Sequence, residues 1–147
     1  MTIDATTTTD YRTTLHIRAD ADAVFDAVTT TDGLGSWWTR ATGSGETGGE
    51  LRFFFSVPEP CVMRVDRADR PGRVEWTVTD CAFLPEWVGT RPTFTIVPGD
   101  ERTTVHFRHH GLNSALDCIE MCTDGWNTHL ASLVRHLEDG AGSPFGG

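Results

Sequence analysis

The sequence Val105-His106-Phe107-Arg108-His109-His110, followed by a break at Gly111 and then by residues 114–139, decides the fold. The first six residues alternate in polarity, which is typical of a strand. Residues 114–139 carry apolar side chains at spacings of three and four, which predicts one amphipathic helix. These apolar positions are Ala115, Cys118, Ile119, Cys122, Trp126, Leu130, Leu133 and Leu137. A single helix with one apolar face, arriving after a series of strands, must lie across a sheet.

Both ends of this expected helix carry local signals. The sequence Ser114-Ala115-Leu116-Asp117 has the form of a capping box, with Asp117 in the acidic position, and predicts that the helix starts here. Gly140 predicts its end. Residues 141–147 are rich in glycine, and we expect them to form a flexible tail.

Alternating segments before the helix predict the rest of the fold. Strands are expected at residues 11–18, 50–57, 61–68, 73–80 and 93–97. Two short helices are expected between the first two strands, at residues 21–29, capped by Asp20, and at residues 31–38. Turns or loops are expected at residues 69–72 and 81–90, and a loop or irregular strand at residues 42–49. The prediction is an α+β helix-grip architecture, in which a curved antiparallel sheet of six or seven strands wraps around the long C-terminal helix.

Length and composition indicate one ordinary domain. The chain has 147 residues, of which 38% are hydrophobic and 22% charged. We expect a domain over residues 11–140, flanked by a flexible N-terminus (1–10) and the flexible tail (141–147). Because no apolar run approaches about 18 residues, no membrane span is expected. The N-terminus lacks the basic start and apolar centre of a secretory signal, so a cytoplasmic protein is expected.

Charge and cysteine content exclude several kinds of partner. The formal net charge is -9 and all 12 basic residues are arginine, so an acidic surface disfavours nucleic acid and acidic membranes. The four cysteines show no Cys-x-x-Cys spacing and are expected to be reduced, buried, small apolar groups. Cys118, Cys122 and His109 are three candidate metal ligands, but a structural zinc site needs a fourth, which is not evident. We therefore expect no metal and no cofactor.

Several motifs along the chain resemble those of one superfamily. In chain order they are Ala21-Asp22-Ala23-Val24-Phe25-Asp26-Ala27, Leu34-Gly35-Ser36-Trp37-Trp38, Gly48-Gly49-Glu50-Leu51, Arg73-Val74-Glu75-Trp76, Thr104-Val105-His106-Phe107-Arg108-His109-His110-Gly111, and Gly125-Trp126 with Leu130 and Ser132-Leu133. Together they resemble the START-like superfamily, also called SRPBCC or the birch-pollen-allergen-like helix-grip fold. Within it, the closest likeness is to proteins similar to the C-terminal domain of the activator of the heat-shock-protein-90 ATPase. The resemblance covers about residues 11–140. It implies a deep cavity between sheet and final helix that often binds apolar molecules, and it supplies no shared catalytic motif.

The alternation and the helix stripe identify inward-facing side chains independently of this resemblance. They predict a ligand-binding wall made of Trp37, Trp38, Phe53, Phe55, Met63, Trp76, Phe94, Phe107, His109, Cys118, Cys122 and Trp126. An aromatic wall with few polar points suits a small hydrophobic or aromatic molecule. The simpler interpretation is that the same side chains pack together as a core.

His109 is the polar residue of most interest, because it shares a strand face with Phe107 and should point inward. A buried imidazole can anchor a ligand carbonyl or act as an acid or base, which makes His109 a weak catalytic candidate. The favoured interpretation is a structural histidine bonded to a backbone group or to Asp117.

Three functions follow from these observations. The leading hypothesis is binding of a small hydrophobic or aromatic molecule in an internal cavity between the sheet and the C-terminal helix, without enzymatic activity. The second is a cyclase- or hydrolase-type enzyme on the same fold, using His109. The third is a chaperone-related protein-interaction module that uses the apolar loop at residues 83–88. Homodimers are common for this fold, so a homodimer is compatible with the sequence although nothing requires it.

Overall fold

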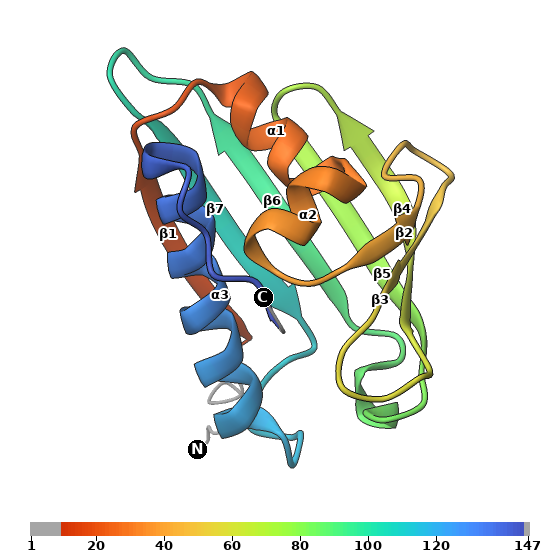
Figure 1. Cartoon of the computed structure of the whole chain (residues 1–147). Helices are drawn as coiled ribbons and strands as arrows, with labels where there is room; N and C mark the ends of the chain where they lie inside the picture. Colours follow the sequence, from red (N-terminus) through yellow and green to blue (C-terminus); the bar gives the residue numbers. More distant parts are fainter. Residues whose placement is uncertain (1–9, 146–147) are drawn as a thin grey trace.

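A computed structural model describes residues 10–145 (Figure 1). The expected flexible N-terminus, residues 1–10, lies outside this range apart from Asp10. The elements in chain order are β1 (Tyr11–Ile17), α1 (Ala21–Thr29), α2 (Thr31–Trp37), β2 (Ala41–Gly43), β3 (Glu50–Phe53), β4 (Cys61–Asp69), β5 (Arg73–Cys81), the 3-10 helix η2 (Pro85–Trp87), β6 (Arg91–Val97), β7 (Thr103–His110) and α3 (Ile119–Asp139). The order confirms the predicted helix-grip architecture.

The strands form one antiparallel sheet in the order β1-β7-β6-β5-β4-β3-β2. All three α-helices cover the same face of this sheet, and α3 runs along it beside β1 and β7 (Figure 1). Cross-strand pairing places Phe94 opposite Phe107 and Val65 opposite Trp76, so the inward side chains of neighbouring strands meet as the alternation predicted.

Local sequence accounts for the two short helices. The Asp20 carboxylate accepts a hydrogen bond from the Ala23 N–H at 2.8 Å and caps α1, and the Thr30 hydroxyl accepts one from the Gly33 N–H at 3.0 Å and caps α2. Gly33 weakens α2 as a helix former but is required by packing, because a Cβ there would lie 2.8 Å from the Ala27 Cα. The glycine therefore allows α1 and α2 to pack closely.

The start of α3 differs from the prediction. The helix begins at Ile119, and residues 114–118 form turns rather than the helical turn that a capping box would open. The carboxylate of Glu86 accepts hydrogen bonds from the backbone N–H groups of Asp117 and Cys118, each at 3.0 Å. A side chain distant in sequence thus satisfies amide groups at the start of the helix, and the local signal at Ser114 is overridden. The end is as predicted, with Gly140 in the left-handed conformation at a φ of 69°.

Two strand boundaries also differ from the prediction. The segment expected as a strand over residues 50–57 ends at Phe53, because its neighbours β2 and β4 offer pairing partners only for residues 50–53. β6 begins at Arg91 rather than at Thr93, since Arg91 and Pro92 pair with His110 and His109 of β7. Proline has no backbone N–H to donate to a neighbouring strand. Pro92 is tolerated because β5 pairs only with residues Thr93–Thr95 of β6, so no hydrogen bond from residue 92 to β5 is needed.

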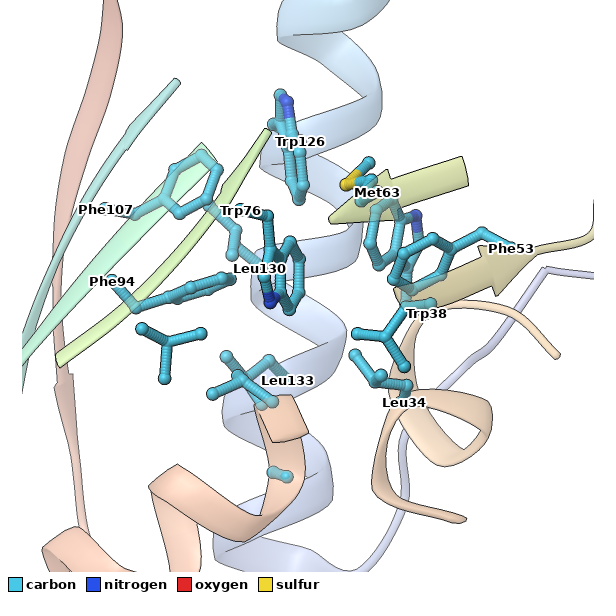
Figure 2. Packing of buried hydrophobic residues seen from close by; sticks show 14 of the residues in the cluster. Leu34, Trp38, Phe53, Met63, Trp76, Phe94, Phe107, Trp126, Leu130 and Leu133 are labelled. Carbon is cyan, nitrogen blue, oxygen red and sulfur yellow. The ribbon is translucent and has the colours of Figure 1, made fainter. Parts of the chain in front are cut away.

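The core fills the space between the sheet and the helices. Figure 2 shows rings from the strands, among them Phe94, Phe107 and Trp76, gathered around Trp126 and Leu130 of α3. Their centroids lie close, 4.9 Å for Phe94 and Phe107 and 4.5 Å for Phe107 and Trp126. Within residues 10–145, none of the helices combines the length and hydrophobicity that crossing a bilayer requires.

Candidate functional site

A pocket of about 300 Å³ lies at one end of the core, where β4 and β5 meet the loop after β5 and the first turns of α3. Its wall is almost entirely apolar, and it contains aromatic rings, three thiols and one thioether. The lining residues are Trp38, Phe55, Cys61, Cys81, Phe83, Leu84, Trp87, Met121, Cys122, Gly125, Trp126 and Phe145. This composition is typical of a site for a small apolar molecule.

The loop after β5 forms one wall because two polar contacts fix it to α3. The Trp87 indole N–H donates to the Cys122 sulfur at 3.3 Å, and the adjacent Glu86 carboxylate caps the helix start. The Trp87 ring lies nearly parallel to that of Trp126, with centroids 6.2 Å apart. Burial of Trp87 and these contacts hold the loop against the helix and leave the pocket between them.

Three side chains at the rim of the pocket are exposed to solvent. Phe83, Met121 and Phe145 have exposed fractions of 40%, 65% and 44%. Phe55 lies between Phe83 and Phe145 and packs edge-on against both, at centroid distances of 5.7 and 5.5 Å. The mouth of the pocket is therefore lined by apolar side chains and not by charged ones.

The described part of the tail reaches this rim. The Ser143 N–H donates to the Ser132 hydroxyl at 2.6 Å, and the Phe145 N–H donates to the Trp38 carbonyl at 2.6 Å. Figure 1 shows this segment running back beside α3 toward α2. Flexibility of the tail stays a prediction, but residues 141–145 lie against the helices and bring Phe145 to the pocket.

The residues that the sequence proposed for a ligand-binding wall divide into two groups. Trp38, Phe55, Cys122 and Trp126 line the pocket. The other eight, packed in the core or beside the pocket rather than lining it, are Trp37, Phe53, Met63, Trp76, Phe94, Phe107, His109 and Cys118. The hollow thus occupies one end of the space between sheet and helix, while interlocked rings fill the remainder.

Eight lining residues were not proposed from the sequence. They are Cys61, Cys81, Phe83, Leu84, Trp87, Met121, Gly125 and Phe145. The accumulation of large apolar residues in the loop at 81–90 was a signal for several of them. A loop has no periodicity, however, so its sequence does not say which side chains turn inward.

His109 is fully buried, and both of its ring nitrogens are engaged. Trp126 Nε1 lies 3.0 Å from His109 Nδ1, and Thr90 Oγ1 lies 2.8 Å from His109 Nε2. An indole N–H only donates, so Nδ1 is the acceptor and Nε2 carries the proton that it donates to Thr90. The Thr90 hydroxyl in turn donates to the Trp87 carbonyl at 2.6 Å.

This chain of hydrogen bonds defines the role of His109. Burial lowers the pKa of His109 to about 3, so the ring is neutral at physiological pH. Neither partner expected from the sequence, a backbone group or Asp117, contacts the imidazole: the side chains of Thr90 and Trp126 bind it, and the N–H of Asp117 binds Glu86. These two contacts leave no ring nitrogen of His109 to bind a substrate.

Few other polar groups lie inside the protein. Among the described residues, Trp76 Nε1 and His129 Nδ1 are buried without a hydrogen-bond partner. Residues 10–145 hold no cluster of three His, Cys, Asp or Glu side chains arranged to bind a metal ion. Burial raises the pKa of the Cys118 thiol to about 12.

Comparison with known proteins gives one family and a common fold. The family model described as "Activator of Hsp90 ATPase homolog 1-like protein" matches residues 18–138. The solution structure of the Aha1 dimer from Colwellia psychrerythraea is 27% identical, covers 91% of this chain and 99% of its own, and superposes with a TM-score of 0.80.

Two further solved structures share the fold at lower identity. Protein BH1534 from Bacillus halodurans is 22% identical, with 90% of this chain and 99% of that chain covered and a TM-score of 0.72. CalU16 from Micromonospora echinospora is 16% identical, with 90% and 75% covered and a TM-score of 0.71. No curated protein matches the sequence.

Proposed function

Because the chain belongs to the family of Activator of Hsp90 ATPase homolog 1-like proteins, a family with the helix-grip fold, we propose that its pocket binds a small, neutral, hydrophobic or aromatic molecule. The observation that carries the proposal is the apolar hollow of about 300 Å³ between the loop after β5 and α3. Its size is at the lower end of the range for small-molecule sites, which favours a ligand of one or two rings.

The polar groups near the pocket argue for a neutral ligand. The indole N–H of Trp87 binds Cys122, and that of Trp126 binds His109, so neither is free to receive a ligand oxygen. An ionised ligand would lose its hydration here without gaining a partner. This surface favours a ligand whose rings stack on the two parallel indoles and displace water from the apolar wall.

The two alternatives receive different support. An enzyme that uses His109 as acid or base gains none, because both imidazole nitrogens are occupied and the ring does not line the pocket. A chaperone-related interaction module stays an alternative, since Phe83 and Val88 of the loop at 83–88 are 40% and 49% exposed. A pull-down tests this alternative with the wild type as bait and Phe83→Ser as the control. The alternative is wrong if the wild type recovers no chaperone.

We further propose a homodimer in the cytoplasm. The Colwellia psychrerythraea protein of 27% identity is described as a dimer. The four cysteines form no disulfide, which fits a compartment where thiols stay reduced. Light scattering on the eluting protein would give twice 16.2 kDa for a dimer, and a mass of 16.2 kDa at all concentrations would contradict it.

Ligand binding is tested with N-phenyl-1-naphthylamine, a neutral aromatic probe whose fluorescence rises in apolar surroundings. Gly125 lines the pocket, and a Cβ at this position meets nothing within 4 Å, so Gly125→Leu fills the hollow without displacing the fold. Gly35 is a matched control, because it is also a helical glycine with open space around its Cβ but lies outside the pocket.

The expected result is saturable binding by the wild type and by Gly35→Leu, and affinity reduced by at least about tenfold in Gly125→Leu, equivalent to about 1.4 kcal/mol. Equal affinity in the two variants would place the probe elsewhere on the protein and contradict the proposal. Absence of binding by the wild type, to this probe and to a panel of neutral aromatic compounds, would contradict it as well.

A further inference from the structure

The outer face of the sheet concentrates positive charge. The three α-helices cover the other face, so the outward side chains of the strands lie on the uncovered side (Figure 1). The three neighbouring strands β1, β7 and β6 contain no aspartate or glutamate, although the chain has 21 acidic residues and 12 basic ones. The net charge of -9 therefore conceals a locally basic face.

Alternation along β7 places its basic side chains on this face. His106, Arg108 and His110 point outward, because the residues between them are buried on the inner face. On the neighbouring strand β1, Arg12 lies directly opposite Arg108 in the antiparallel register. Like charges in directly opposite positions destabilise a sheet, and an anion bound between them would remove this repulsion.

These side chains surround a hollow of about 560 Å³. Its lining consists of three arginines, two histidines, four threonines and Phe107, and no Asp or Glu of residues 10–145 contributes to it. Guanidinium and hydroxyl groups donate hydrogen bonds to phosphate oxygens, and a planar guanidinium can donate two in parallel. The volume is within the range of small-molecule sites.

Arg73 of β5 forms the other end of the hollow and is held in position. Its Nε donates to the Glu75 carboxylate at 2.7 Å, and its Nη1 donates to the Thr95 hydroxyl at 2.6 Å. Its Nη2 makes neither of these bonds, and the Thr95 hydroxyl still has its own proton to donate. Because β6 separates β5 from β7, Arg73 starts about 10 Å across the sheet from the strand of Arg108. The hollow therefore has two basic ends.

Carboxylates limit the basic area. Asp10 forms an ion pair with Arg108 at 2.9 Å, and Glu75 forms one with Arg73. On the next strand, β4, Asp66 adds a further negative charge. A long polyanion that followed the sheet would meet these groups, so the area suits a small anionic molecule better than a nucleic acid or an acidic segment of a protein.

We propose that this hollow binds a small molecule with two phosphate groups, one held between Arg12 and Arg108 and the other at Arg73. Two phosphates joined by a short carbon skeleton reach both basic ends, whereas a single phosphate reaches only one. The threonine hydroxyls between the ends donate to oxygens in the middle of the ligand. This site lies on the opposite face of the sheet from the apolar pocket and does not depend on the proposed function.

The test compares fructose 1,6-bisphosphate with fructose 6-phosphate in calorimetric titrations of the full-length protein at constant ionic strength. We expect the bisphosphate to bind at least about tenfold more tightly, because its second phosphate gains charge-assisted hydrogen bonds. Equal affinity for the two sugars would overturn the assignment of two phosphates.

Arg12→Gln locates the binding in the hollow. Arg12 is exposed and forms no ion pair with a carboxylate of residues 10–145, so the substitution leaves the fold intact. It should weaken binding of fructose 1,6-bisphosphate about fivefold or more. Arg102→Gln is the matched control, because it removes the same charge from an exposed position outside the hollow. Equal weakening in the two variants would show that overall charge attracts the ligand and would overturn the proposal.

A second readout needs no variant. Burial lowers the pKa of His110, and the neighbouring Arg108 and Arg91 lower it further. Arg73 acts in the same direction and Asp10 in the opposite one. A phosphate bound beside this ring should raise its pKa, which is followed through the ring-proton NMR signals over a series of pH values. An unchanged pKa under saturating fructose 1,6-bisphosphate would contradict this placement of the ligand.

Two macromolecular anions complete the test. If decathymidylate or polyglutamate binds while fructose 1,6-bisphosphate does not, the basic face serves a macromolecule and the small-molecule site is wrong. Binding of the bisphosphate that weakens only in Arg12→Gln and raises the pKa of His110 supports the inference. Either result leaves the proposal for the apolar pocket unaffected, since the two sites lie on opposite faces of the sheet.

Discussion

The buried imidazole of His109 should make the stability of the protein depend on pH in a defined window. Its pKa is lowered by burial from its ordinary value of 6.5 to about 3 in the folded protein. The unfolded chain therefore binds a proton as the pH falls through about 6.5, while the folded chain does not. The stabilisation is complete above the unfolded pKa and is lost progressively as the pH falls toward the folded value.

The size of the effect follows from these two values. Between about pH 7.5 and about pH 5, one histidine with these pKa values reduces the free energy of unfolding by about 2 kcal/mol. His110 and His129 also have pKa values lowered mainly by burial, and their loss of stability falls in the same window. A comparison with a variant that lacks only His109 removes their contribution.

The substitution is His109→Gln, whose amide does not titrate and can still donate a hydrogen bond toward Thr90. Urea unfolding of both proteins at a series of pH values gives the free energy of unfolding, and the readout is its change with pH. We expect the variant to be less stable throughout but to lose about 2 kcal/mol less than the wild type between about pH 7.5 and pH 5. Equal losses in the two proteins would refute the assignment of His109 as a buried neutral residue.

Three other substitutions test the elements around the pocket. Glu86→Gln weakens the hydrogen bonds to the amide groups at the start of α3 and should reduce the free energy of unfolding by about 1 kcal/mol. Glu120→Gln, in the first turn of α3 and without those hydrogen bonds, serves as its control. Gly125→Ala should raise the free energy of unfolding by about 1 kcal/mol, and the melting temperature by roughly 3 °C, because the added Cβ enters open space. A lower melting temperature would contradict this. Phe145→Ala removes an edge-on contact with Phe55 at the rim of the pocket. Dissociation of N-phenyl-1-naphthylamine, measured by stopped-flow fluorescence, should become roughly threefold to tenfold faster. An unchanged rate would show that the tail does not cover the mouth of the pocket.

The fold was predictable because its signals are local and periodic. The cap at Asp20, the alternation of the strands and the stripe on α3 each agree with the observed elements. The start of α3 was not predictable, because its cap comes from Glu86, 31 residues away from Asp117. No local pattern reports a partner at that distance.

The pocket was predictable only in part, for a different physical reason. Strand and helix periodicity shows that Phe94, Phe107 and Trp126 point inward, but not how tightly their rings pack. How much space remains depends on the shapes of all neighbouring side chains together. The pocket lies beside Trp87, whose indole N–H binds the Cys122 sulfur, and this contact joins segments 35 residues apart.

We propose that an apolar molecule occupies the hollow between the loop after β5 and α3. The most direct measurement is a titration of isotope-labelled protein with N-phenyl-1-naphthylamine, followed by the NMR signals of the backbone amides and the indole N–H groups. If the probe enters this pocket, the shifts will concentrate at Gly125, Cys122 and the indoles of Trp87 and Trp126. Shifts confined to the outer face of the sheet, around Arg12 and Arg108, or no shifts at all, would contradict it.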